Sequence, residues 1–184
     1  MRIPGIGPLR HLRLWSLGLL LLVLITAGCG GPAGPVTHVS AKGVVADLPG
    51  TDWSSAGVTR KGAVEFETWR NPDNTLIFRV STMPDEEFNV RLNRQVVETY
   101  MNSMYPYASE ATPSLLRGRN AFQLFAVQPE PDSFTVTEYA VIYKGRHYFV
   151  GAGTTIEKWN ADGRDIVEGI INTIQFEEPT DTDE

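Results

Sequence analysis

The sequence predicts an α+β fold, a mainly antiparallel β-sheet with helices packed on it. Three observations support this class. Several stretches, such as residues 63–69, alternate apolar and polar side chains with the period of two that a strand requires. Short turns join consecutive strands, which makes them antiparallel neighbours. Two longer stretches, residues 85–104 and 162–174, repeat apolar residues at helical spacing and are expected to pack on the sheet as a sandwich.

The predicted strands follow the chain in order from the first alternating stretch. They span residues 63–69, 76–82, 120–128, 134–143 and 146–153, and residues 175–176 form a closing edge segment. In the first strand, Glu65 and Glu67 occupy the face opposite Phe66, which we assign to solvent. The turn Lys144-Gly145 joins the last two strands, because its glycine can adopt the positive φ of a tight hairpin.

Both helices carry start signals and an apolar stripe. The first begins after Thr82 as a hydroxyl cap, with Pro84 and acidic residues 85–87 in its first turn. Its stripe recurs at steps of four: Phe88, Leu92, Val96, Tyr100 and Met104. The second begins at Asp162 and Asp165, which are spaced as in a capping box. Its stripe consists of Ile166, Val167, Ile170, Ile171 and Ile174.

The first 28 residues have the organisation of a secretory signal peptide. Three arginines precede an apolar run over residues 14–25, which is too short to cross a bilayer as a helix of about 20 residues. Residues 25–29 resemble a bacterial lipobox that ends in Cys29. Because Cys29 is the only cysteine, it cannot form an intramolecular disulfide, and we predict that it is lipidated. Two alternatives are a buried core helix and an ordinary secreted protein with a free thiol.

These features divide the chain into four parts. Residues 1–28 are the signal peptide, 29–38 the lipidated cysteine with a Gly/Pro-rich tether, 39–176 one domain, and 177–184 an acidic, disordered tail. We expect the protein outside the cytoplasm, on the outer membrane if the host has one and otherwise on the outer face of the cell membrane. Beyond residue 28 the chain has 13 basic and 22 acidic residues, a net charge of −9. That charge argues against nucleic acid as a partner and against an electrostatic attachment to anionic lipids.

A family likeness is distributed over residues 44–176. It is carried by Leu48-Pro49 with Trp53 shortly after, the hairpin of residues 64–68 and 76–80, the helix of residues 85–104, Gly118 to Ala121 before a strand, the turn-linked pair 139–148 and the closing stretch 166–176. The arrangement resembles the PsbP-like fold, shared by the extrinsic PsbP subunit of photosystem II, the DcrB-like bacterial proteins and the LpqN-type mycobacterial lipoproteins. This resemblance implies a PsbP-like sandwich and a binding or assembly factor, and it carries over no cofactor residues.

The sequence predicts no catalytic, cofactor or metal site. His38 falls in the tether, and His147 lies in an aromatic strand, where we interpret it as a packed or edge-facing side chain. With no cysteine available in the domain, the common structural zinc sets are excluded. Paired carboxylates for hydrolysis could come from Glu65 with Glu67, or from the acidic residues 85–87. A small cell-envelope hydrolase is therefore the alternative. The glycines of residues 151–153 are expected to mark a bend or bulge at a strand end.

An interaction surface is the preferred prediction. Tyr105 and Tyr107 flank Pro106, which ends a helix, so we expect both rings to be exposed and to contact a partner. Trp159 is a similar case in which packing is favoured. The predicted function is therefore a membrane-anchored, non-enzymatic binding or assembly factor for an envelope or membrane-protein partner of unknown identity. A structural envelope lipoprotein without a discrete ligand is a further alternative.

Overall fold

The computed structural model describes residues 34–61, 64–83, 92–105, 107–128 and 133–177. They belong to one compact unit, Gly34–Glu184. The predicted signal peptide, Cys29 and all but the first residue of the acidic tail lie outside the described residues and stay predictions. In the part of the chain that is described, no helix combines the length and the apolar character needed to cross a membrane.

The main sheet has eight strands, and every pairing among the described residues is antiparallel. Its order is β3 (Ser54–Lys61), β4 (Val64–Arg70), β5 (Leu76–Met83), β10 (Arg146–Thr155), β9 (Phe134–Tyr143), β8 (Arg119–Gln128) and β6 (Tyr107–Ala108), with β7 (Thr112–Leu116) also on β8. The predicted α+β class is confirmed. Strands β3, β6 and β7 were not predicted from the sequence.

A smaller sheet consists of β1 (Val36–Val39), β2 (Val44–Leu48) and β11 (Gln175–Phe176), with β2 in the middle. The fold therefore starts before residue 39. Placing His38 in the tether is wrong, because it pairs with Ala46 and its ring lies 4.4 Å from that of Trp69. The run of glycines and prolines before β1 ends at Pro35. The next four residues, 36–39, alternate apolar and polar side chains, which is enough for one short strand.

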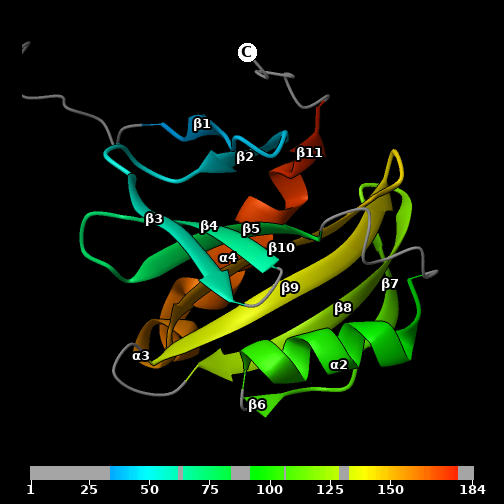
Figure 1. Ribbon diagram of the computed structural model, residues 1–184. Helices are drawn as coiled ribbons and strands as arrows, with labels where there is room; N and C mark the ends of the chain where they lie inside the picture. Colours follow the sequence, from blue (N-terminus) through cyan, green and yellow to red (C-terminus); the bar gives the residue numbers. More distant parts are fainter. Residues whose placement is uncertain (1–33, 62–63, 84–91, 106, 129–132, 178–184) are drawn as a thin grey trace, which may run out of the picture. The chain divides into compact units, whose positions relative to one another are not determined.

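Helices cover both faces of the main sheet (Figure 1). Helix α2 (Arg94–Met104) lies on one face, and α3 (Ile156–Lys158), the π-helix η1 (Trp159–Gly163) and α4 (Arg164–Thr173) lie on the other. Successive residues of a strand therefore belong to different cores: in β5, Phe78 and Val80 pack on the α4 side and Ile77 on the α2 side. A sheet covered on both faces leaves little solvent-facing surface on its central strands.

The first helix differs from its prediction in start and stripe. The predicted start at residue 85 lies outside the described part, but Thr82 is a strand residue of β5, and α2 is capped by Asn93, whose Oδ1 accepts from Val96 N at 3.0 Å. The fully buried residues are Val97, Tyr100 and Met101. A helix has 3.6 residues per turn, so a stripe built on steps of four alone drifts away from the sheet.

The last helical segment begins six residues before the predicted cap. Thr155 caps it by accepting from Lys158 N at 3.3 Å, whereas Asp162 lies inside η1 and pairs with Lys158 at 3.5 Å. The capping-box assignment is therefore wrong. The stripe is confirmed, since four of its five residues, Val167, Ile170, Ile171 and Ile174, are buried.

Glycines act at a turn and within a strand. Lys144 and Gly145 both have positive φ, 47° and 82°, which confirms the tight hairpin. Gly151 lies in the middle of β10 in unbroken register with β5 and β9, so the predicted bend or bulge is wrong. A Cβ at Gly151 would lie 2.5 Å from the Thr137 carbonyl oxygen, and this close approach of β9 is what requires glycine.

Candidate functional site

A groove opens between the edge of the main sheet and the last helical segment. Its floor consists of two directly opposed pairs, Phe125 with Thr137 and Gln123 with Tyr139, because paired residues on adjacent strands share one face. We call it the aromatic groove. It has a volume of about 540 Å³ and is lined by Gln123, Phe125, Thr137, Tyr139, Trp159, Arg164, Glu168, Ile171 and Asn172.

The π-helical turn positions the aromatic wall of the groove. Trp159 is the first residue of η1, and its ring lies 5.1 Å from that of Phe125 at an interplanar angle of 60°. Gly163 ends η1 against α3 and β10, where a Cβ would lie 2.7 Å from Thr154 Cγ2. A π turn inside a helix is rare and is frequently found at functional sites. In this protein the π turn places the indole of Trp159 against Phe125, a floor residue that is 38 % exposed.

The rim of the aromatic groove is polar. Arg164 Nε donates to Glu168 Oε1 at 3.0 Å along the exposed side of α4. Burial raises the pKa of Tyr139, and the nearby Glu168 carboxylate raises it further, so this phenol stays protonated and remains a hydrogen-bond donor or acceptor. Apolar rings below with amide, guanidinium and carboxylate groups at the edge suit a chain segment that has both an apolar side chain and a polar backbone.

The structure separates the two tyrosines of the predicted partner surface. Tyr107 is 66 % exposed and pairs with Val127, which places it on the same face of β8 as Phe125 and beside the aromatic groove. Tyr105 is only 2 % exposed, so the expectation that it lies at the surface is wrong. Residue 105 caps α2, and its ring turns towards the sheet instead of following the chain outwards. A role in binding a partner stays a prediction for Tyr107.

Tyr105 belongs to a buried polar network on the α2 side of the sheet. Its hydroxyl accepts from Arg79 Nη1 at 2.5 Å and donates to Glu138 Oε2 at 2.8 Å. Arg79 and Glu138 both lie opposite Gly151, on the strands either side of β10, so the missing side chain leaves room for them to approach each other. Beside them, Tyr100 and Ser81 share a hydrogen bond of 2.9 Å.

The network controls the ionisation of its members. Burial raises the pKa of Glu138, while Arg79 and the Tyr105 hydroxyl hold it down. Burial also raises the pKa of Tyr105 well above its usual value, and Glu138 adds to that shift. Because Glu138 is 1 % exposed, this group is closed to substrate and is best described as part of the core.

Glu65 and Glu67, the described carboxylates among those considered for hydrolysis, both interact with the turn that carries Lys42. Glu67 is 7 % exposed, so assigning it to a solvent face is wrong; burial raises its pKa, and Lys42 partly opposes that effect. Glu65 is half-buried and pairs with Lys42 at 3.5 Å. The turn between β1 and β2 carries Lys42 and covers this end of β4, which explains the burial. Residues 85–87 lie outside the described part.

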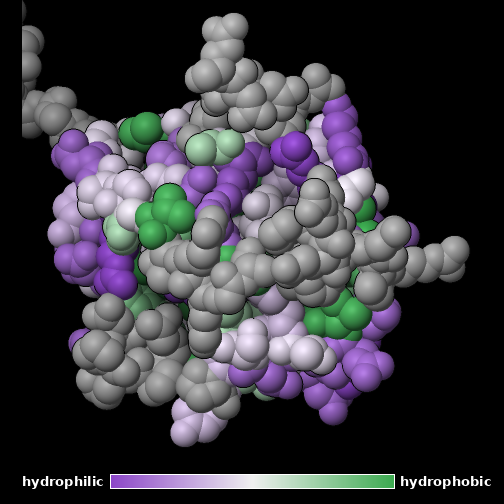
Figure 2. Space-filling model, in the orientation of Figure 1, coloured by the Kyte–Doolittle hydropathy of each residue, from purple (hydrophilic) through white to green (hydrophobic). Residues whose placement is uncertain are grey.

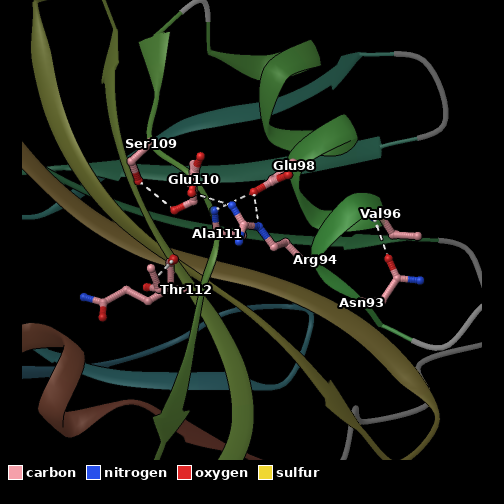
Figure 3. A network of polar contacts seen from close by, with 9 residues as sticks. Asn93, Arg94, Val96, Glu98, Ser109, Glu110, Ala111 and Thr112 are labelled. Carbon is pink, nitrogen blue, oxygen red and sulfur yellow. Dashed lines mark hydrogen bonds and ion pairs between the residues drawn. The ribbon is translucent and has the colours of Figure 1, made fainter.

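Polar groups at the start of α2 serve the fold. Arg94 Nε donates to Glu98 Oε1 at 2.7 Å and Arg94 Nη2 to Glu110 Oε2, while Ala111 N donates to Glu98 (Figure 3). This arrangement ties the start of α2 to the chain before β7. Figure 2 shows apolar residues on the α2 side as separate small groups among polar ones.

Chemical groups for catalysis are sparse among the described residues. A second hollow of about 560 Å³ beside the β7–β8 hairpin is lined by residues such as Pro113, Arg119 and Ile142. Glu168 is the one acidic side chain found in the lining of either hollow. Over the part of the chain that is described, no group of three or more histidine, cysteine or acidic residues is placed to hold a metal ion. His147 is 4 % exposed, which agrees with a packed side chain.

Comparison with solved structures defines the class as a PsbP-like fold. The solution structure of cyanobacterial PsbP (CyanoP) from Synechocystis sp. PCC 6803 matches with a TM-score of 0.57 and 12 % identity, over 82 % of this chain and 96 % of that one. LpqN, involved in cell envelope biogenesis of Mycobacterium tuberculosis, matches with a TM-score of 0.39 and 13 % identity, over 80 % and 86 %. No family model and no curated protein sequence matches the chain. The resemblance to CyanoP is one of fold, and it confirms the family resemblance at that level.

The sequence contained a signal for part of this site. Trp159 and Tyr107 stood out as aromatic residues near helix ends, but nothing placed them on one face of the sheet. The floor residues Phe125 and Tyr139 look like ordinary alternating strand residues. Only the pairing of β8 with β9, and of β6 with β8, brings these four rings to the same side.

Proposed function

We propose that this protein is an extracytoplasmic, lipid-anchored binding factor that holds a segment of an envelope or membrane protein in the aromatic groove. One observation supports this most directly: the open groove, with Phe125 and Tyr107 exposed on the same sheet face. Aromatic rings bury much area at low entropic cost, which makes them favoured contact residues. Of the acidic residues considered for hydrolysis, Glu65 and Glu67 lie in the described part of the chain and do not line this groove, so binding fits its chemistry better than hydrolysis.

The geometry also suggests what kind of segment would fit. The rings of Phe125 and Trp159 contact each other and together offer an apolar surface to one apolar side chain. Gln123 and Asn172, which also line the groove, offer amide groups to the backbone of the bound segment. A polar, mixed-charge rim of this kind is typical of a transient protein contact. The lipobox-like sequence that ends in Cys29 supports the anchor, and the PsbP-like resemblance supports a non-enzymatic role.

Photocrosslinking from the groove tests the proposal in intact cells. A benzophenone amino acid replaces Phe125 in the full chain, and a control chain carries it at Val58, which is 63 % exposed on β3 at the opposite edge of the sheet. We expect one recurrent envelope protein to crosslink from residue 125 and not from residue 58. Equal crosslinking from both positions would contradict a discrete site.

A substitution then measures how much the exposed ring contributes. Tyr107→Ala should weaken binding of the crosslinked partner by about 2 kcal/mol, or roughly 30-fold, if Tyr107 is a contact hot spot. Because the side chain is exposed, the free energy of unfolding should change by no more than about 0.5 kcal/mol. Unchanged affinity with an unchanged unfolding curve would remove Tyr107 from the site.

A further inference from the structure

Two hairpin turns bring four basic side chains to one end of the main sheet. Arg117 and Arg119 flank the β7–β8 turn, and Lys144 and Arg146 flank the β9–β10 turn; all four residues are exposed. We call this group the basic collar. It holds four of the 13 basic residues beyond the signal peptide, in a chain whose net charge there is −9. Such a local excess of positive charge is unexpected on an acidic protein.

The basic collar surrounds a single aromatic ring. The guanidinium carbon of Arg119 lies 4.6 Å from the centroid of the Tyr143 ring, and Lys144 Nζ lies 5.7 Å from it. Arg146 is the direct cross-strand partner of Tyr143, so its side chain projects from the same face of the sheet. Arg117 Nη1 donates to the Asn172 carbonyl oxygen at 3.1 Å, which holds this arginine at the end of α4.

The acidic segment of the chain leaves the fold at this ring. Phe176 is the last residue of β11, and its ring lies 5.3 Å from that of Tyr143. Residues 177–184 follow directly and include five acidic side chains. The backbone N–H of Glu177 donates to the Gly43 carbonyl oxygen at 2.8 Å, so the segment starts from a fixed point.

We propose that the basic collar is a docking surface for the chain's own acidic segment, residues 177–184. Charge complementarity favours this occupant, since the collar has four positive side chains and the segment has five negative ones. Reach favours it too, because eight residues extend up to about 26 Å from Phe176. Covalent attachment gives a segment of this length an effective concentration on the order of millimolar, well above that of a free competitor. The docked segment neutralises the collar and keeps it from phosphate-bearing lipid surfaces.

Paramagnetic labelling tests the contact directly. A soluble chain of residues 30–184 contains the whole compact unit. Because it lacks Cys29, the only cysteine of the sequence, it has no thiol. Thr182→Cys then introduces one attachment site for a nitroxide without removing an acidic residue. We expect amide signals of residues 117–119 and 143–146 to broaden selectively. The broadening should vanish in about 1 M salt, where the screening length is about 3 Å.

Two matched variants decide the outcome. In one, the five acidic residues of 177–184 are replaced by their amides; in the other, Arg119 and Lys144 are replaced by glutamate. Both should abolish the broadening while leaving the unfolding curve unchanged. Broadening that persists in either variant, or in high salt, would overturn the proposal. The proposal would also be overturned by two results together. The hairpin signals would be the same with the wild-type and the amide-substituted segment, and vesicles of anionic phospholipid would bind the wild-type collar. The occupant would then be a lipid headgroup.

Discussion

Tyr105 links two buried charges that would otherwise lie in an apolar core. Its hydroxyl bridges Arg79 and Glu138, and neither Arg79 Nε nor Glu138 Oε1 has another partner in the described structure. Tyr105→Phe keeps the packed ring and removes only the bridge. We expect the free energy of unfolding to fall by about 1.5–3 kcal/mol, the usual value of a hydrogen bond to a charged group. Urea unfolding at neutral pH measures it.

Tyr100→Phe is the matched control for this prediction. Tyr100 is buried on the same helix, but its hydroxyl shares a hydrogen bond with the neutral Ser81. Its loss should cost about 0.5–1.5 kcal/mol. Equal losses in the two variants would show that the charges of Arg79 and Glu138 do not depend on the Tyr105 hydroxyl.

Glu67 gives the stability a pH dependence of known sign. Burial raises its pKa in the folded state, so the folded protein binds the proton more tightly than the unfolded chain does. Its contribution to stability is complete below the unfolded value and is lost as pH rises through the raised one. Glu67→Gln, which stays neutral, should therefore become more stable relative to wild type as pH rises from about 4.5 towards neutral. Urea unfolding across this range checks it.

Asp73→Asn provides a control with the opposite sign. The Thr75 hydroxyl and backbone N–H donate to Asp73 and lower its pKa, so ionised Asp73 adds stability that disappears as pH falls. The stability of this variant relative to wild type should decrease with rising pH, where that of Glu67→Gln increases. If the stabilities of the two variants relative to wild type change in the same direction with pH, burial does not raise the pKa of Glu67 in the folded state.

At the scale of elements, Gly151 shows how closely β9 and β10 pack. An added Cβ would lie 2.5 Å from the Thr137 carbonyl oxygen and 3.0 Å from Glu138 Cα, both backbone atoms that cannot rotate away. Gly151→Ala should therefore destabilise the protein by about 1–3 kcal/mol. Gly169→Ala is the control: it lies exposed in α4 with nothing within 4 Å of an added Cβ, so it should stabilise by about 0.5–1 kcal/mol. Thermal unfolding of both variants separates the two cases.

The elements that sequence patterns predict well are those with a strong local signal. Periodicity identifies the strands after residue 119 and the stripe of α4, and Gly145 identifies the turn between β9 and β10. The structure contains all of them. Strands β1, β2 and β3 are short or polar, so the local pattern that would identify them is weak. Strand β2 also pairs with β11, which lies more than 100 residues further along the chain, and a local pattern cannot reveal such a partner.

The candidate site was less predictable than the fold, for a related reason. Alternation assigns each strand residue to one of two faces but does not reveal that both faces are covered. Glu67 was assigned to the surface for that reason and is buried. Tyr105 and Tyr107 were both expected at the surface because they flank Pro106. That local argument holds for Tyr107, which is exposed, and fails for Tyr105, whose ring packs under the helix.

At the scale of the whole domain, Trp159 in the aromatic wall of the groove and the basic collar lie beyond opposite ends of β10. Strand β10 runs from the collar at Arg146 to Thr155, where the helical segment that carries Trp159 begins. Ten strand residues span about 33 Å. In Figure 1, β1, through which the chain enters the fold, lies at the end with β11 and the hairpin turns, and α3 lies at the other.

The last prediction tests the lipid anchor predicted at Cys29. If Cys29 carries two or three acyl chains, at about 0.8 kcal/mol per buried CH₂, it holds the protein firmly on the membrane. Cys29→Ala removes the only acylation site, so the protein should move from the membrane pellet to the soluble fraction. The wild-type protein should stay in the pellet after a wash at about 1 M salt, which would release a purely electrostatic attachment. A Cys29→Ala chain that stays in the pellet at the wild-type level would show instead that the apolar segment of residues 14–25 holds the protein there.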